Sequence, residues 1–155
     1  MSEESTTPDL VELMHRMAAA ANEQDLDTAD RYYAPDALWD SSRTGAGIFE
    51  GAATTRRFFE EWRSTFEEWE IGFDELLDMG NGVVFSLVRQ AGRPVGVTGY
   101  VRQREGWVWV WVESVITSVT TYPEADMDEA RATAERLAES PIAGSSCTSP
   151  TRAGP

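Results

Sequence analysis

Few side chains in this sequence could do chemistry. The 155 residues include one histidine, His15, and one cysteine, Cys147, and every one of the 13 basic residues is arginine. Without lysine there is no Schiff-base chemistry and no phosphate-loop lysine. A Cys/His zinc site, a Cys-His pair and a Ser-His-Asp triad all need more than one well-placed His or Cys. We therefore predict no metal site and no cofactor, which leaves carboxylic acids and tyrosines as candidate proton carriers.

Asp40 is the acid in the most suggestive position. It follows Trp39 at the end of a predicted strand, residues 37–40, and precedes a loop that contains Gly45 and Gly47. A carboxyl against an apolar wall has a raised pKa and can carry a proton. Asp40 is thus the candidate catalytic acid or base. The sequence leaves open the alternative that its carboxylate caps the turn that follows.

A stripe of three tryptophans is the second candidate feature. Trp107, Trp109 and Trp111 alternate with valines, so both faces of their strand are apolar, as in a strand that is buried on both sides. The tryptophans either form a flat pocket wall for a cyclic ligand or pack against the core or a partner subunit. The other predicted pocket residues are Met17, Tyr33, Trp39, Phe59, Trp62, Phe66 and Arg89.

The first half of the chain reads as helices that could hold these residues in place. Thr7 can cap a first helix whose opening turn takes Pro8 and Asp9, and a short second helix capped by Asp25 must end by Ala34. A third helix follows Gly51. Its apolar stripe is predicted to contain Phe58, Phe59, Trp62, Phe66 and Trp69.

The second half reads as antiparallel sheet, with a final helix capped by Asp126 and Glu129. Turns are expected at residues 80–82 and 92–94, and the last hairpin could turn at 105–106 or at 113–114. Helices set apart from a long sheet predict an α+β fold. We expect a strongly curved antiparallel sheet that forms a cone around the N-terminal and central helices.

Several segments resemble the SnoaL-like family of the nuclear transport factor 2-like superfamily. They are 25–27, 33–40, 47–51, 87–90 and 122–131, within a match over about residues 8–139. The resemblance implies a cystatin-like, steroid isomerase-like cone, a turn of the last hairpin at Glu113-Ser114, and a homodimer formed through the outer faces of the sheets. The best-known members are polyketide cyclases.

The resemblance also locates three positions that are catalytic in the steroid isomerases. Their base matches Ser41, their oxyanion-holding tyrosine matches Met17, and their second acid matches Trp107 or Val108. All three residue types have changed in this sequence, which argues against a steroid isomerase mechanism.

Charge and composition limit the partners. The formal net charge of −14 disfavours nucleic acid and anionic membrane surfaces. No segment is long and apolar enough for a spanning helix, and the acidic start is unlike a signal peptide, so we expect a cytoplasmic protein. Residues 1–7 are expected to form an N-terminal arm, 8–139 one domain, and 140–155, which contain Cys147, a disordered tail rich in Ser, Pro and Gly.

Two functions remain open at this stage. One is an enzyme that moves a proton on a small apolar or cyclic metabolite in an aromatic pocket, as an isomerase, cyclase or hydrolase, with Asp40 as acid or base. The other is a non-catalytic module that binds such a metabolite or serves as a dimeric interaction unit. The sequence does not decide whether the protein is an enzyme.

Overall fold

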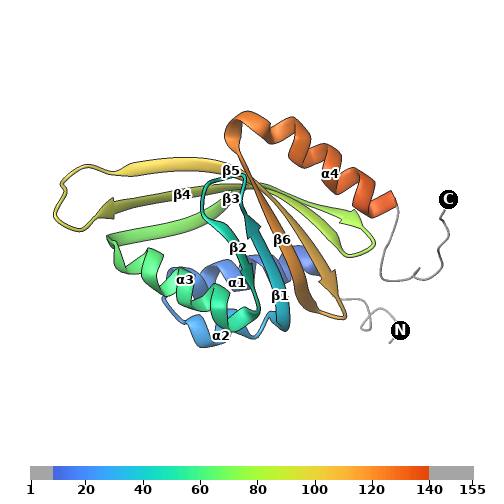
Figure 1. Ribbon diagram of the computed structural model, residues 1–155, viewed down its shortest axis with the longest axis horizontal. Helices are drawn as coiled ribbons and strands as arrows, with labels where there is room; N and C mark the ends of the chain where they lie inside the picture. Colours follow the sequence, from blue (N-terminus) through green and yellow to red (C-terminus); the bar gives the residue numbers. More distant parts are fainter. Residues whose placement is uncertain (1–8, 140–155) are drawn as a thin grey trace.

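The computed structural model describes residues 9–139, which form a curved six-stranded sheet with helices on both faces (Figure 1). The predicted arm, 1–7, and the predicted tail, 140–155, lie outside the described residues. The helices are α1 (Leu10–Asn22), α2 (Leu26–Asp30), α3 (Ala52–Ser64) and α4 (Met127–Glu139), the last preceded by a 3-10 turn, η2 (Glu124–Asp126). The strands are β1 (Tyr33–Ser41), β2 (Gly47–Glu50), β3 (Phe66–Gly80), β4 (Val83–Pro94), β5 (Val101–Val112) and β6 (Val115–Pro123).

The strand order in the sheet is β2-β1-β6-β5-β4-β3. Strands β1 and β6 run parallel, and the other neighbours run antiparallel. Helices α1, α2 and α3 lie on the concave side, whereas α4 lies on the outer side, and β4 and β5 extend beyond the helices as a long hairpin (Figure 1). The predicted α+β cone is confirmed, with one parallel strand pair in an otherwise antiparallel sheet.

The sheet separates two apolar cores because side chains alternate between its faces. The concave core includes Met14, Trp39, Val88 and Trp109, with α1 packed against it. The outer core lies under α4 and contains Val83, Phe85, Val108, Tyr122, Ala130 and Ala134. Strand β5 contributes to both, since its tryptophans face the concave side and Val108 faces α4.

Two helix boundaries differ from the sequence-based expectation. Helix α1 begins at Leu10, and its cap is Asp9, whose carboxylate accepts a hydrogen bond from the amide of Glu12. Helix α3 ends at Ser64, so Phe66 and Trp69 belong to β3. The hydroxyls of Ser64 and Thr65 donate to carbonyls in the last turn of α3, which helps to end the helix there.

Of the turns expected in the second half, the turn of the last hairpin is confirmed and the turn at residues 92–94 is not. Glu113 and Ser114 have φ values of 52° and 73° and form the tight turn between β5 and β6, which confirms the later of the two predicted positions. The turn expected at residues 92–94 was wrong. Strand β4 continues to Pro94, and the amide of Val95 donates to the carbonyl of Thr65, which holds this end of β4 beside β3.

Helix α4 occupies part of the outer sheet face. Arg131 on this helix bonds Glu75 of β3 and lies over the ring of Phe85, and the Tyr122 hydroxyl donates to Thr133. A dimer formed through the outer faces stays a prediction, and it would have to use sheet surface that α4 leaves uncovered.

Candidate functional site

A cavity of about 450 Å³ is lined by residues of the concave face of the sheet and of helices α1, α2 and α3. Most of its wall is apolar or aromatic. Eight of the predicted pocket residues line it: Met17, Tyr33, Trp39, Phe59, Trp62, Phe66, Trp107 and Trp109. The structure therefore brings these residues together from α1, α3 and the strands β1, β3 and β5 around one internal space.

Trp39 is the centre of the aromatic wall. Its ring meets Phe59, Trp107 and Trp109 edge to face, with centroid separations of 4.8, 5.1 and 6.0 Å. Edge-to-face contacts place the positive edge of one ring against the negative face of the next, which favours a fixed arrangement. This side of the cavity is a rigid wall made of interlocked rings.

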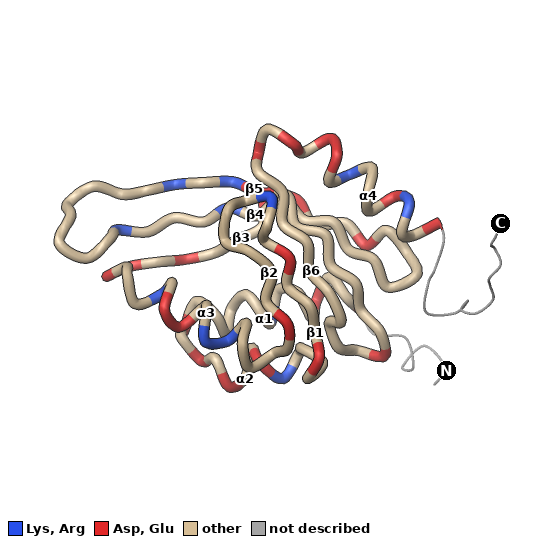
Figure 2. The backbone as a smooth tube through the Cα atoms, in the orientation of Figure 1, with Lys and Arg blue, Asp and Glu red and all other residues tan. Residues whose placement is uncertain are grey.

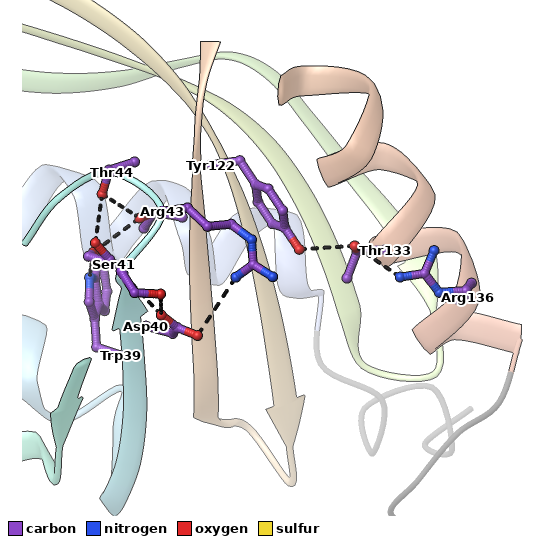
Figure 3. Close-up of polar contacts among 10 residues, drawn as sticks. Trp39, Asp40, Ser41, Arg43, Thr44, Tyr122, Thr133 and Arg136 are labelled. Atoms are coloured by element: carbon purple, nitrogen blue, oxygen red, sulfur yellow. Dashed lines mark hydrogen bonds and ion pairs between the residues drawn. The ribbon is translucent and has the colours of Figure 1, made fainter. Parts of the chain in front are cut away.

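A short network of hydrogen bonds fixes the indole of Trp39 (Figure 3). The indole Nε1 of Trp39 donates to Oγ of Ser41 at 2.7 Å, and the hydroxyl of Thr121 donates to the same oxygen at 3.1 Å. Thr44 closes the network through a 3.0 Å contact with Thr121. Ser41 stands at the position that matches the steroid isomerase base. It has no carboxyl group, and its hydroxyl orients the ring of Trp39.

Several polar side-chain groups in the cavity wall have no hydrogen-bond partner among residues 9–139. They include the amide of Gln90, which is only 8% exposed, and the hydroxyl of Tyr33. Burial, with a smaller effect from Asp30, raises the pKa of the Tyr33 hydroxyl well above its usual value. Tyr33 is therefore neutral at physiological pH and can act as a hydrogen-bond donor.

The charged groups at the cavity are paired with one another. Arg56 lies 2.7 Å from a carboxylate oxygen of Asp27 and 3.1 Å from one of Glu60, with Asp30 at 3.9 Å. These hydrogen bonds raise the pKa of Arg56 further. The guanidinium is already hydrogen-bonded to two carboxylates and near a third, so it offers little to an anionic ligand.

Asp40 lies outside the set of residues that line the cavity. One residue after Trp39 on β1, its side chain points to the other face of the sheet. Its carboxylate accepts hydrogen bonds from the hydroxyl and the amide of Ser42, at 2.6 and 3.0 Å, and lies 3.8 Å from Arg43 (Figure 3). These contacts, the Ser42 hydroxyl first, lower the pKa of Asp40. A catalytic role for Asp40 stays a prediction, but the geometry is that of a turn cap.

Arg89 and Trp111 also lie outside the cavity lining. Arg89 is opposite Gly72 in the register of β3 and β4, and its guanidinium bonds Asp74, which also pairs with Arg104 at 3.2 Å. Arginines follow the long hairpin of β4 and β5 in Figure 2. Trp111 is buried against Tyr32, with ring centroids 6.4 Å apart. Arg89 immediately precedes Gln90, which faces the cavity, so the two side chains lie on opposite faces of β4.

Glu105 is the one acid on β5 that shares the tryptophan face. Its carboxylate accepts hydrogen bonds from Nε1 of Trp107 at 2.7 Å and from the amide of Gln103 at 3.0 Å. Burial raises the pKa of Glu105, and the bond from Trp107 partly opposes this shift. Glu105 does not line the cavity itself, but it anchors one ring of the wall.

The wall residues that sequence reasoning missed include Trp69, Ile71, Phe73 and Gln90. Three of them follow one another at every second position of β3, and this alternation is the signal that could have found them. Gln90 could have been found by continuing the same face along β4 from Val84 and Val88, both fully buried. Nε1 of Trp69 and Nε of Arg63, another lining residue, are buried donors with no partner within residues 9–139.

No group of three or more His, Cys, Asp or Glu side chains within residues 9–139 is arranged to hold a metal ion. No helix in this part of the chain has the length and apolar character that crossing a membrane requires.

Solved structures with the same fold share little sequence with this chain. A protein from Catenulispora acidiphila with a ketosteroid isomerase-like fold, in complex with trimethylamine, superimposes with a TM-score of 0.63 at 17% identity, covering 76% of this chain and 86% of that one. A cystatin-fold protein from Novosphingobium aromaticivorans gives 0.64 at 20% identity, covering 74% and 98%. TerC, co-crystallised with polyporic acid, gives 0.63 at 13% identity, covering 77% and 94%.

A family model provides the assignment that these distant structures cannot. No curated protein matches the chain. The SnoaL-like domain model matches residues 14–118, which run from α1 into β6 and include most of the cavity wall. The protein is a member of the SnoaL-like domain family, with the α+β fold of the nuclear transport factor 2-like proteins.

Proposed function

We propose that this protein binds a small apolar or cyclic molecule in the aromatic cavity, and that binding, without acid/base catalysis by Asp40, is its activity. The observation that carries the proposal is the cavity itself. Its volume of about 450 Å³ lies within the usual range for small-molecule sites, roughly 300–1,000 Å³, and its wall is mainly apolar.

The shape of the wall supports a flat ring as the ligand. Trp39 meets Trp107 and Trp109 edge to face, and the indole N–H of each of the three donates a hydrogen bond to a neighbouring side chain. A rigid aromatic surface loses little conformational entropy when a planar ligand stacks on it. Two proteins of the same fold were solved with small molecules, polyporic acid and trimethylamine, which is consistent with a ligand site in this fold.

The placement of the acids supports binding over proton transfer. Asp40 is hydrogen-bonded to Ser42 on the other side of the sheet, and the resulting fall in its pKa favours the carboxylate form. Within the lining, Asp30 and Glu60 are paired with Arg56. A general acid or base needs a pKa near the working pH and a free path to the substrate. Asp40 lacks both, and Asp30 and Glu60 have no free path because they are paired with Arg56.

A cavity-filling substitution tests the proposal. Ala21 lines the cavity, whereas Ala19, on the same helix, is exposed. Ala21→Phe places a ring in the cavity, and Ala19→Phe adds the same ring on the solvent side. We expect Ala21→Phe to weaken the binding of 1-tetralone, measured by calorimetry, by about tenfold or more, because each lost CH₂-sized contact is worth about 0.8 kcal/mol.

The control separates this effect from damage to helix α1. Ala19→Phe should leave the affinity unchanged, and both variants should unfold at similar urea concentrations. Equal affinities for 1-tetralone in the parent and Ala21→Phe would place the binding elsewhere. No binding of 1-tetralone or of other bicyclic compounds to the parent would contradict the proposal.

A further inference from the structure

Gln90 is an amide in a wall that is otherwise suited to apolar groups. It is 8% exposed, it lines the cavity, and it makes no hydrogen bond to any of the described residues. Buried polar groups in proteins almost always have a partner. We therefore expect an amide that faces a cavity, and that has no hydrogen-bond partner in the protein, to bond to a molecule in the cavity.

The strand pattern shows how Gln90 comes to lie there. On β4 the concave face carries Val84 and Val88, both fully buried, and Gln90 is the next residue on that face. Its register partner on β3 is Ile71. A leucine at this position would bury its side chain without a desolvation cost. The amide has a use only if a polar group of a ligand, or a water held in its place, reaches it.

Other unmatched groups in the wall are donors too. The Tyr33 hydroxyl has no described partner, and burial raises its pKa so that it keeps its proton. Trp69 Nε1 and Arg63 Nε are buried N–H groups without an acceptor among residues 9–139. Trp69 is two residues from Ile71 on β3, so it is a diagonal neighbour of Gln90. These donors of the cavity wall therefore lack an acceptor among the described residues.

The charges of the lining disfavour an anion as the missing acceptor. Three lining acids, Asp30, Glu60 and Glu67, face two lining arginines, Arg56 and Arg63. Arg56 is bonded to carboxylates, and Nη1 of Arg63 donates to the carbonyl of Phe66 at 2.9 Å. Acceptor oxygens without a charge fit these surroundings better than a carboxylate does.

We propose that the ligand is a neutral, flat cyclic compound with a carbonyl oxygen that accepts a hydrogen bond from the amide of Gln90, and with a second oxygen within reach of the Tyr33 hydroxyl. This rests on the proposed function, because it names the chemical class for the same cavity. It assigns Gln90 as the principal recognition residue and Tyr33 as the second.

A pair of probes that differ by one oxygen tests the assignment. 1-Tetralone and tetralin share a bicyclic skeleton, and only 1-tetralone has a carbonyl. We expect the parent to bind 1-tetralone about three- to tenfold more tightly, which is the usual net value of one hydrogen bond to a neutral group. In Gln90→Leu this preference should disappear while the affinity for tetralin is kept, and that retained affinity shows that the variant is folded.

Tyr33→Phe and Tyr32→Phe form the second comparison. For 6-hydroxy-1-tetralone, Tyr33→Phe should lower the affinity, whereas Tyr32→Phe should not, because Tyr32 packs on Trp111 outside the lining. Equal binding of 1-tetralone and tetralin by the parent, or a preference that survives in Gln90→Leu, overturns the inference but leaves the proposed function in place. Failure of every probe to bind overturns both.

Discussion

Replacing Ser41 with alanine should be costly for such a small change. The hydroxyl of Ser41 accepts hydrogen bonds from Nε1 of Trp39 and from Oγ1 of Thr121, and these residues are 2% and 1% exposed. In Ser41→Ala the Thr121 hydroxyl keeps Thr44 as a partner. The indole N–H of Trp39 keeps none, and at this depth water cannot replace the lost oxygen.

The magnitude follows from that one orphaned donor. A buried donor left without a partner costs about 1–3 kcal/mol, and the lost Ser41–Thr121 bond adds to this. We expect Ser41→Ala to lower the free energy of unfolding by about 2–3 kcal/mol. Thr121→Val keeps the Trp39–Ser41 bond and should cost less, about 0.5–1.5 kcal/mol.

Urea unfolding followed by far-ultraviolet circular dichroism measures these differences, and Trp39→Phe completes a double-mutant cycle. If the cost comes from the indole N–H, Ser41→Ala should cost much less in the Trp39→Phe background, because that background has no N–H to orphan. A cost of Ser41→Ala that is equal in the two backgrounds, or smaller than that of Thr121→Val, would refute this reasoning.

Two further predictions concern pH. Burial raises the folded-state pKa of Glu105 above its unfolded value near 4.5, so the stability that its protonated form contributes at low pH is lost as the pH rises through the folded pKa. Glu105→Gln, whose amide oxygen can still accept from Trp107, should therefore gain stability relative to the parent as the pH rises above 4.5; urea midpoints that move in parallel as the pH rises would contradict it. The pKa of Asp40 is lowered, so its contribution is present above the unfolded value of 3.8 and is lost as the pH falls through the folded pKa. Asp40→Asn should be less stable than the parent at pH 7, and this difference should shrink as the pH falls below 3.8. The affinity for 1-tetralone should be unchanged, and a weakened affinity would restore Asp40 as a functional residue.

The alternation of β5 made much of the cavity predictable. Trp107 and Trp109 repeat at every second residue, so they must share a face, and the large side chains of that face fill the concave side. The sequence could not choose between the concave side and an interface, because that choice depends on where the helices pack. In the structure, α1 and α3 lie over the tryptophan face of the sheet, so Trp107 and Trp109 line the cavity.

The errors came from patterns that fit two kinds of structure. Phe66 and Trp69 continue the helical spacing of Phe59 and Trp62, and they lie equally well at the start of a bulged strand. Nothing in their spacing shows that the hydroxyls of residues 64 and 65 end the helix first. Arg89 was predicted to line the pocket for a similar reason, since the strand assignment did not settle which of two neighbouring positions faces inward.

Strand β5 separates the concave core from the outer core, with Trp107 and Trp109 on one side and Val108 on the other. Val108 packs under α4 in a close-packed core, where a change of even one methylene is felt by the neighbours. A substitution beneath α4 therefore shifts the backbone that carries the tryptophans without touching the cavity. On the proposed function, substitutions in the outer helix would change the ligand preference from a distance while they leave the aromatic wall itself intact.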